Sequence, residues 1–459
     1  MKPEAHGLRK ELGLSDLVLA QVLCVVGASW VGIAAKLGRT HVVLWIAAML
    51  LFYVPLAVVV IYLNRLLPLE GGVYQWAKGA FGEAAGFLIA WNLWVYAVIV
   101  TGAILFVVPT DLGYMLGSSG ARIASNKPVT LLITGSLMAG IAIVAWLGLD
   151  FSKWLHNAGS AAIILAFAVL ISLPFLRPSH YEAIPIAMPK LNLYTLAIFG
   201  QMTVGGLSGF EYIAIMAGEC RSAARTVGQS VVISAPLIAL MFILGTSSVL
   251  AFHDGAPINV IGPIPQTMRL ALGEHSGFAP FAIFLLIVRA IAGASLIFTG
   301  LTRLPMAAGW DGVVPAWFTK LHPTRRTPVH SILFVAAVIM ILIVLSMTGV
   351  REQEASQLLT ISSVALYAIV YIALFAIPVF GRLNLPGWLK PIAWTGLAAS
   401  AVSLFFAVYP IVDVTSKSSY VMKIASVVVI SNLAGLAVYW PGRRAAVQTM
   451  SRDERPAIT

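Results

Sequence analysis

The sequence is poor in charge: 10% of its 459 residues are Asp, Glu, Lys or Arg, whereas 59% are hydrophobic. Soluble proteins of ordinary composition carry about 25% charged residues. This shortage excludes a soluble globular protein and indicates an integral membrane protein. The net charge of +11 at pH 7 is not gathered in a basic cluster on a soluble segment, so we expect no nucleic-acid partner.

Cysteines and clustered metal ligands are scarce as well. Cys24 and Cys220 are the two cysteines, and they share no exposed loop, so we expect no disulfide. The histidines are scattered without ligand spacing, which argues against a metal site. Membrane enzymes cluster His, Asp or Glu on neighbouring spans, so we expect neither catalysis nor a cofactor. The first span lacks a small-residue cleavage site, and a removable signal peptide is therefore not expected.

Long apolar runs are what the sequence has in quantity. Twelve of them are long enough to cross a bilayer, which takes about 20 residues. They cover residues 16–36, 41–63, 84–110, 129–149, 157–176, 193–218, 229–252, 277–300, 329–349, 357–379, 391–411 and 421–441. Because the connections are short, we expect one all-α polytopic domain over residues 1–459, in contact with the lipid bilayer.

Lys and Arg are distributed unevenly between the two sets of loops. If the N-terminus lies inside, the termini and the loops on that side hold 18 Lys and Arg, the opposite loops hold 10, and Arg289 lies within a span. Cytoplasmic loops carry the basic excess in membrane proteins. We therefore expect a multi-pass protein of the plasma (inner) membrane with both termini in the cytoplasm.

Small residues interrupt two of the spans at mid-depth. Span one carries Gly27, Ala28 and Ser29 there, and span six carries Gly205 and Gly206. Irregular backbone is tolerated at this depth only where it lines protein or a wet cavity. The two spans are five apart, so the second unit would be inverted, and paired interruptions of this kind mark transporter binding sites. Glycines that serve close helix packing are the alternative.

The two breaks would expose backbone groups of opposite polarity. The second half of span one begins with amide donors at residues 28–30, which suit a carboxylate. The first half of span six ends with carbonyls at residues 203–206, which suit an ammonium group. Together the breaks predict a site for the zwitterionic head of an amino acid.

An acid, Glu211, follows the break in span six. A carboxylate within a membrane segment is costly and by default marks a functional site. It could pair with a substrate ammonium, accept a coupled proton, or cap the amides of the next half-helix. These three roles stay open.

Four stretches resemble a known family of transporters. "GASWVG" and "SGFEYIAIMAGECRSAARTVGQSV" resemble the first and sixth helices of the amino acid–polyamine–organocation superfamily. Residues 67–94, "LPLEGGVYQWAKGAFGEAAGFLIAWNLW", are similar to its loop and third helix. Residues 299–329 are similar to its eighth helix and the following loop. Together the four stretches span most of the chain in the family's order.

The resemblance implies an architecture. Ten core helices would form two inverted five-helix repeats over 16–180 and 193–380, with helices 1 and 6 discontinuous and alternating access around a central site. Two additional helices would follow over 390–441. The cytoplasmic termini would be 1–15 and 442–459.

The resemblance also implies site residues, which are Gly27, Ala28 and Ser29 for the carboxylate, Val204, Gly206 and Leu207 for the amino group, and Glu211 beside them. Where many relatives carry an aromatic gate, this chain has Gly205, so the gate is missing or supplied by Trp30 or Phe210. Where some relatives carry a lysine that replaces a sodium ion, it has Ile163. Coupling to H+, coupling to Na+ and exchange therefore all stay open.

Two further charged residues lie at or within spans. Asp111, near the end of span three, fits interface solvation or a vestibule that attracts cations. Arg289, deep in span eight, would pair with an acid, snorkel or bind a ligand. The sequence thus favours a secondary transporter for a small-molecule substrate, either amino acids or related small amines. A polyamine carrier of the same fold is the alternative, and a channel is less favoured because no continuous polar lining is visible. The oligomeric state is not indicated.

Overall fold

The computed structural model describes residues 13–67, 72–120, 122–123, 125–177, 185–209, 223–253, 257–273, 276–307 and 313–453. Within these ranges the chain is helical and forms no β-sheet. The α-helices are α1 (Leu14–Val25), α2 (Ala28–Ala35), α3 (His41–Ala48), α4 (Val54–Leu66), α5 (Val73–Phe81), α6 (Glu83–Leu116), α7 (Lys127–Leu147), α8 (Leu149–Leu176), α9 (Leu193–Gly200), α11 (Ala223–Ala251), α12 (Pro263–Leu272), α13 (Phe278–Ala307), α14 (Ala316–Thr319), α15 (Val329–Ser346), α16 (Glu352–Phe380), α17 (Leu389–Phe406) and α18 (Lys417–Asp453). Two π-helical segments, η2 (Met49–Tyr53) and η5 (Gln201–Gly206), interrupt them.

The helices confirm a polytopic membrane protein. In the described part of the chain, ten helical segments are long and apolar enough to cross a membrane, and the bent pair α1–α2 adds an eleventh. Every predicted span has a helix at its place. The sixth predicted span can be followed through α9 and η5 only as far as Gly209. The count of twelve spans and the inverted-repeat layout therefore stay predictions.

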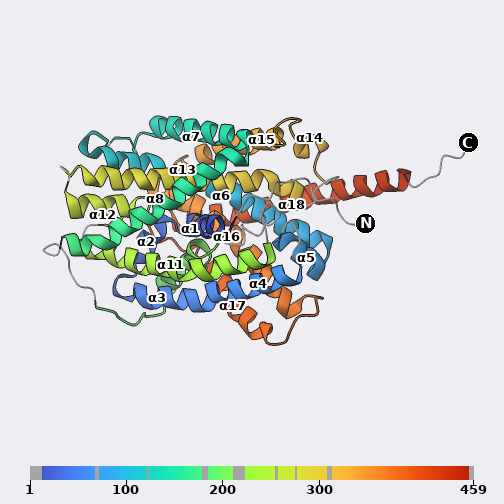
Figure 1. Ribbon diagram of the computed structural model, residues 1–459, viewed down its shortest axis with the longest axis horizontal. Helices are drawn as coiled ribbons and strands as arrows, with labels where there is room; N and C mark the ends of the chain where they lie inside the picture. Colours follow the sequence, from blue (N-terminus) through green and yellow to red (C-terminus); the bar gives the residue numbers. More distant parts are fainter. Residues whose placement is uncertain are drawn as a thin grey trace, which may run out of the picture.

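The long helices run side by side along the long axis of the molecule (Figure 1). The short helix α12 lies at one end of the bundle with α2 and α3, and α5 lies at the opposite end. The helices α6 and α13 form the centre, since 78% of the residues in the most apolar stretch of each are buried. In α18 the share is 11%. The centre of the bundle is thus built from α6 and α13, with α16 packed against α6.

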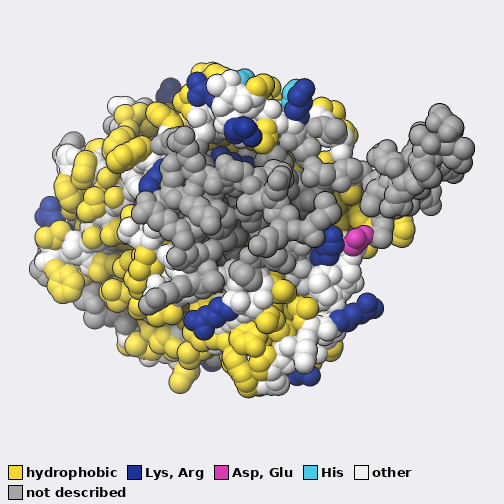
Figure 2. Space-filling model, turned by 45° about the vertical axis from the view of Figure 1, so that its right-hand side comes forward, with side chains coloured by type: hydrophobic (Ala, Val, Ile, Leu, Met, Phe, Trp, Pro, Cys, Tyr) yellow, Lys and Arg dark blue, Asp and Glu magenta, His cyan; other side chains and the backbone are white. Residues whose placement is uncertain are grey.

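Apolar side chains cover much of the described surface in Figure 2, around the grey area, and Lys and Arg are scattered among them. Phe175 is 84% exposed and Phe405 is 70% exposed. Lipid tails are as apolar as these side chains, so their exposure carries no penalty in a bilayer. This surface therefore suits lipid contact.

The break in span one lies where the sequence predicts it. Helix α1 ends at Val25, Val26 and Gly27 are extended, and α2 begins at Ala28 with its axis bent by 44° from that of α1. A Cβ atom at Gly27 would lie 2.5 Å from Cδ1 of Trp30. Glycine is required here because the indole packs directly on the backbone of the break.

Candidate functional site

A single cavity joins the two interrupted spans. It is lined by the break between α1 and α2, by η5 and Ser208, and by one face each of α6, α13 and α16. These segments come from both predicted repeats. The interruptions in spans one and six therefore open onto the same space.

The structure places most of the predicted site residues at this cavity. Gly27, Ala28, Ser29, Trp30 and Val204 line it. The neighbouring positions 206 and 207 are buried just behind this lining, where a Cβ atom at residue 206 would lie 3.2 Å from Cη2 of the Trp45 ring. The other two predicted site residues, Phe210 and Glu211, lie outside the described residues, so their roles stay open.

The break in span one presents amide donors to the cavity. No side chain caps α2 at Gly27, and the first N–H groups of a helix have no partner within it. The amide of Trp30 donates to the carbonyl of Gly27 at 3.2 Å. Of the three predicted amide donors, that of Trp30 is therefore already bonded, and those of Ala28 and Ser29 are the candidates to bind a ligand.

The break in span six presents carbonyl groups. The helix α9 passes into η5, and the chain leaves helical geometry at Leu207. The carbonyl of Thr203 accepts from the amide of Leu207 at 3.0 Å, and the carbonyls of residues 204–206 follow it at this end. Gly209 has φ +115°, a conformation that favours glycine. Its amide donates to the hydroxyl of Tyr371 at 3.2 Å.

Trp30 lies between the two breaks. Its ring packs on Gly27 at one side, and at the other side a Cβ atom on Gly205 would lie 2.2 Å from Cη2 of the ring. The indole thus fills the space that a side chain at position 205 would need. Within the described residues, the ring in front of Gly205 therefore comes from α2, and its role as a gate stays a prediction.

Asp111 belongs to the cavity, and its interpretation as an interface residue is wrong. It lines the cavity, is 2% exposed, and its Oδ1 atom has no hydrogen-bond partner. A Cβ atom on Gly262 would lie 3.4 Å from that oxygen. The segment that leads into α12 therefore covers the end of α6 and buries the carboxylate.

Arg289 also lines the cavity. Its Nη2 atom donates to the carbonyl of Leu23, in the last turn of α1, at 3.2 Å. A cation at the C-terminal end of a helix is stabilised by the helix dipole. The ion pairs among the described residues are Lys78–Glu83 and Lys153–Asp16, so the expected acid partner of Arg289 is not found there.

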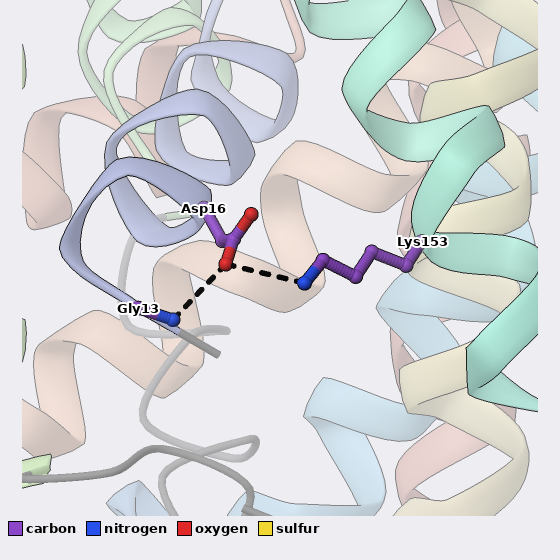
Figure 3. A network of polar contacts seen from close by, with 3 residues as sticks. All are labelled: Gly13, Asp16 and Lys153. Carbon is purple, nitrogen blue, oxygen red and sulfur yellow. Dashed lines mark hydrogen bonds and ion pairs between the residues drawn. The ribbon is translucent and has the colours of Figure 1, made fainter. Parts of the chain in front are cut away.

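The two halves of the broken helix share α11 as a neighbour, and each also packs against a second helix. Figure 3 shows Asp16 of α1 accepting from the amide of Gly13 at 3.0 Å and facing Lys153 of α8, with Oδ2 and Nζ 3.4 Å apart. Gln21 of α1 accepts from Ser234 of α11 and donates to Ser230 at 2.8 Å. On the other side of the break, α2 packs against α11 as well as α12.

These features define the class of multi-pass membrane carriers with discontinuous helices around a central cavity. The chain belongs to the amino acid permease family, whose model matches residues 16–432. This match confirms the resemblance to the amino acid–polyamine–organocation superfamily.

Several transporters are similar to the chain over most of its length. An uncharacterised transporter of Legionella pneumophila is 24% identical over 82% of both chains. A probable agmatine/putrescine antiporter of Lactococcus lactis is 22% identical over 68% of this chain and 67% of its own. The methylthioribose transporter of Bacillus subtilis is 22% identical over 71% of this chain and 72% of its own. The names of these relatives differ in substrate, so they establish a transporter without establishing its cargo.

Proposed function

We propose that the protein is a secondary active transporter that moves amino acids or related small amines across the plasma membrane by alternating access, with both termini in the cytoplasm. The observation that carries this proposal is the shared cavity, because the interruptions of α1–α2 and η5 open onto it together. Substrate sites of secondary transporters that work by alternating access are typically formed by discontinuous helices of this kind.

The backbone at the cavity offers two opposite poles to an amino acid. The amides of Ala28 and Ser29, at the positive end of the α2 dipole, suit the carboxylate. The carbonyls of Val204, Gly205 and Gly206 suit the ammonium group. Both sets of groups are already fixed by the helices around them, so little ordering is needed when the substrate binds.

The anchors of α1 and α2 suit alternating access. Both half-helices pack against α11, but α1 is also attached to α8 through Asp16 and Lys153, whereas α2 also packs against α12. The extended residues Val26 and Gly27 between them allow a change of angle without a loss of helical hydrogen bonds. We infer that α1 swings away from α8 when the site opens to the cytoplasm.

A polyamine carrier is the second candidate. The buried carboxylate of Asp111 in the cavity favours it, because an amine without a carboxylate needs acidic partners. The name of the Lactococcus lactis relative points in the same direction for that protein.

The test is counterflow with the purified full-length chain in liposomes. We expect labelled amino acid uptake to saturate and to be stimulated by unlabelled substrate inside, and imposed H+ or Na+ gradients identify the coupling ion. Flux that does not saturate would indicate a channel. A folded protein that exchanges no amino acid and no amine would contradict the proposal.

A variant at the break adds a sharper test. Gly206→Val places a branched side chain against Trp45, where even a single Cβ would lie 3.2 Å from Cη2, and should abolish counterflow while the protein still inserts. Gly140→Val is the matched control, since nothing lies within 4 Å of a Cβ atom there. Full transport by Gly206→Val would contradict the central site.

A further inference from the structure

Three buried polar atoms without a partner meet the same cavity from three helices. They are Oδ1 of Asp111 on α6, Nε of Arg289 on α13 and Oε1 of Gln357 on α16. The three residues are 2%, 8% and 2% exposed. Native proteins rarely leave such groups unpaired, because each loses its hydration without a compensating hydrogen bond. Three of them around one cavity indicate a ligand that supplies the missing partners.

The guanidinium of Arg289 is fixed at the break in span one. Its bond to the carbonyl of Leu23 occupies one of five N–H donors. Leu23 is separated from α2 only by the end of α1 and the extended residues 26 and 27. The positive group therefore lies at the α1 side of the break and lines the same cavity as Ala28 and Ser29, and a cation and helix-terminal amides both favour an anion.

Asp111 lies on the α12 side of that position. Val108 of α6 packs in one cluster with Ile287 and Ala290 of α13, so residue 289 lies at the level of Val108. Asp111 is nearly one helical turn further along α6, which is about 5 Å. Its carboxylate is covered by the segment before α12, whereas the guanidinium reaches toward α1. No ion pair joins the two opposite charges in the described part of the chain.

A substrate that satisfies all these groups needs three charges. We propose that the cavity selects amino acids with a cationic side chain. Arg289 and the α2 amides bind the carboxylate, the η5 carbonyls bind the α-ammonium group, and Asp111 with Gln357 binds the distal cation. This proposal about the substrate rests on the proposed transport function and narrows its substrate class.

The same arrangement disfavours the two neighbouring classes of substrate. A neutral amino acid leaves the carboxylate of Asp111 without a partner in a buried site, which is costly. A diamine leaves Arg289 without an anion and adds a like charge near it, which is also costly. Arg289 therefore argues against the polyamine candidate that Asp111 alone would favour.

Counterflow competition tests this with three ligands that differ by one group each. Lysine carries all three charges, norleucine lacks the distal cation, and cadaverine lacks the carboxylate. The native chain should prefer lysine to each of the others by about tenfold or more. Asp111→Asn should abolish the preference over norleucine, and Arg289→Gln should abolish the preference over cadaverine.

Matched variants separate recognition from folding. Asp413→Asn and Arg382→Gln remove a like charge at exposed positions outside the cavity and should leave both preferences unchanged. Because Arg289 also binds the end of α1, Arg289→Lys keeps a cation there and should retain part of the preference over cadaverine. Asp111→Asn carries the test alone if both Arg289 variants fail to fold.

The outcomes distinguish the two proposals. If the native chain exchanges norleucine or cadaverine as well as lysine, and the Asp111 and Arg289 variants leave the ratios unchanged, the three-charge site is wrong although the protein is a carrier. If the folded native chain exchanges none of the standard amino acids and no amine, the proposed function itself is wrong.

Discussion

A side chain at Gly205 would force Trp30 out of its place between the two breaks. In Gly205→Ala the new Cβ atom would lie 2.2 Å from Cη2 and 2.6 Å from Cζ3 of the indole. Ordinary contact begins near 3.4 Å, so the ring must move by about 1 Å or the backbone of η5 must shift. Overpacking of this kind costs about 1–3 kcal/mol. We expect the lower half of that range because Trp30 borders a cavity.

A double-mutant cycle isolates this contact. Trp30→Ala removes the ring, and in that background Gly205→Ala meets no indole, so its cost should vanish. The expected coupling free energy is about 1–2 kcal/mol in favour of the double variant. Thermal denaturation of the four purified proteins measures it as a difference in Tm, and counterflow in liposomes reports whether the site survives.

The control is Gly140→Ala on α7, where no atom lies within 4 Å of a new Cβ. It should be neutral or stabilising, because glycine within a helix costs about 0.5–1 kcal/mol relative to alanine. If the effects of Trp30→Ala and Gly205→Ala simply add, within about 0.5 kcal/mol, the indole does not occupy the space in front of Gly205. The placement of the aromatic group on α2 would then be refuted.

Three further predictions concern the same region. Lys153→Gln removes the ion pair with Asp16. It should change the free energy of unfolding by less than about 1 kcal/mol but increase the rate at which Cys24 is alkylated. An unchanged alkylation rate would show that the ion pair does not hold α1. Cys24 lines the cavity. In a Cys220→Ser background, its alkylation should block counterflow, and bound substrate should slow the alkylation. Full transport activity of the alkylated protein would refute the position of the site. Gly209→Ala forces alanine to φ +115° and should lower the Tm by several degrees. The backbone strain costs more than the stabilisation of about 0.4–1 kcal/mol that Gly→Ala gives at a compatible site. An unchanged Tm would contradict the backbone geometry of the break.

The spans could be predicted because lipid leaves the backbone little choice. A chain in hydrocarbon must satisfy its own amides and carbonyls, so each long apolar run becomes a helix. The same reasoning placed the break in span one at Gly27, where α1 and α2 do separate. It could not predict the π-helical form of η5, which the local sequence does not signal.

Two short helices could have been found from local signals in the sequence. In α5 the buried residues include Val73, Trp76, Ala77 and Ala80, a spacing typical of one helical face. The helix α12 begins with Pro263, which is common in a first helical turn. Neither helix is long enough to register as a membrane span, so hydropathy alone passes over both.

The surroundings of Asp111 and Arg289 could not be read from one sequence. The predicted third span ends at residue 110, whereas α6 continues to Leu116. The segment before α12 covers this extension, and it comes from more than 140 residues further along the chain. The contact of Arg289 with Leu23 joins the predicted eighth and first spans. Such contacts depend on how the helices pack, which the apolar pattern of each span does not determine.

The central claim is that the exposed backbone ends of two broken helices hold the substrate in one cavity. It is tested most directly by determining the structure of the full chain with lysine bound. We expect the carboxylate at the amides of Ala28 and Ser29 beside Arg289, the α-ammonium at the carbonyls of Val204 to Gly206, and the side-chain ammonium at Asp111. A ligand bound elsewhere, or helices that run unbroken through spans one and six, would contradict it.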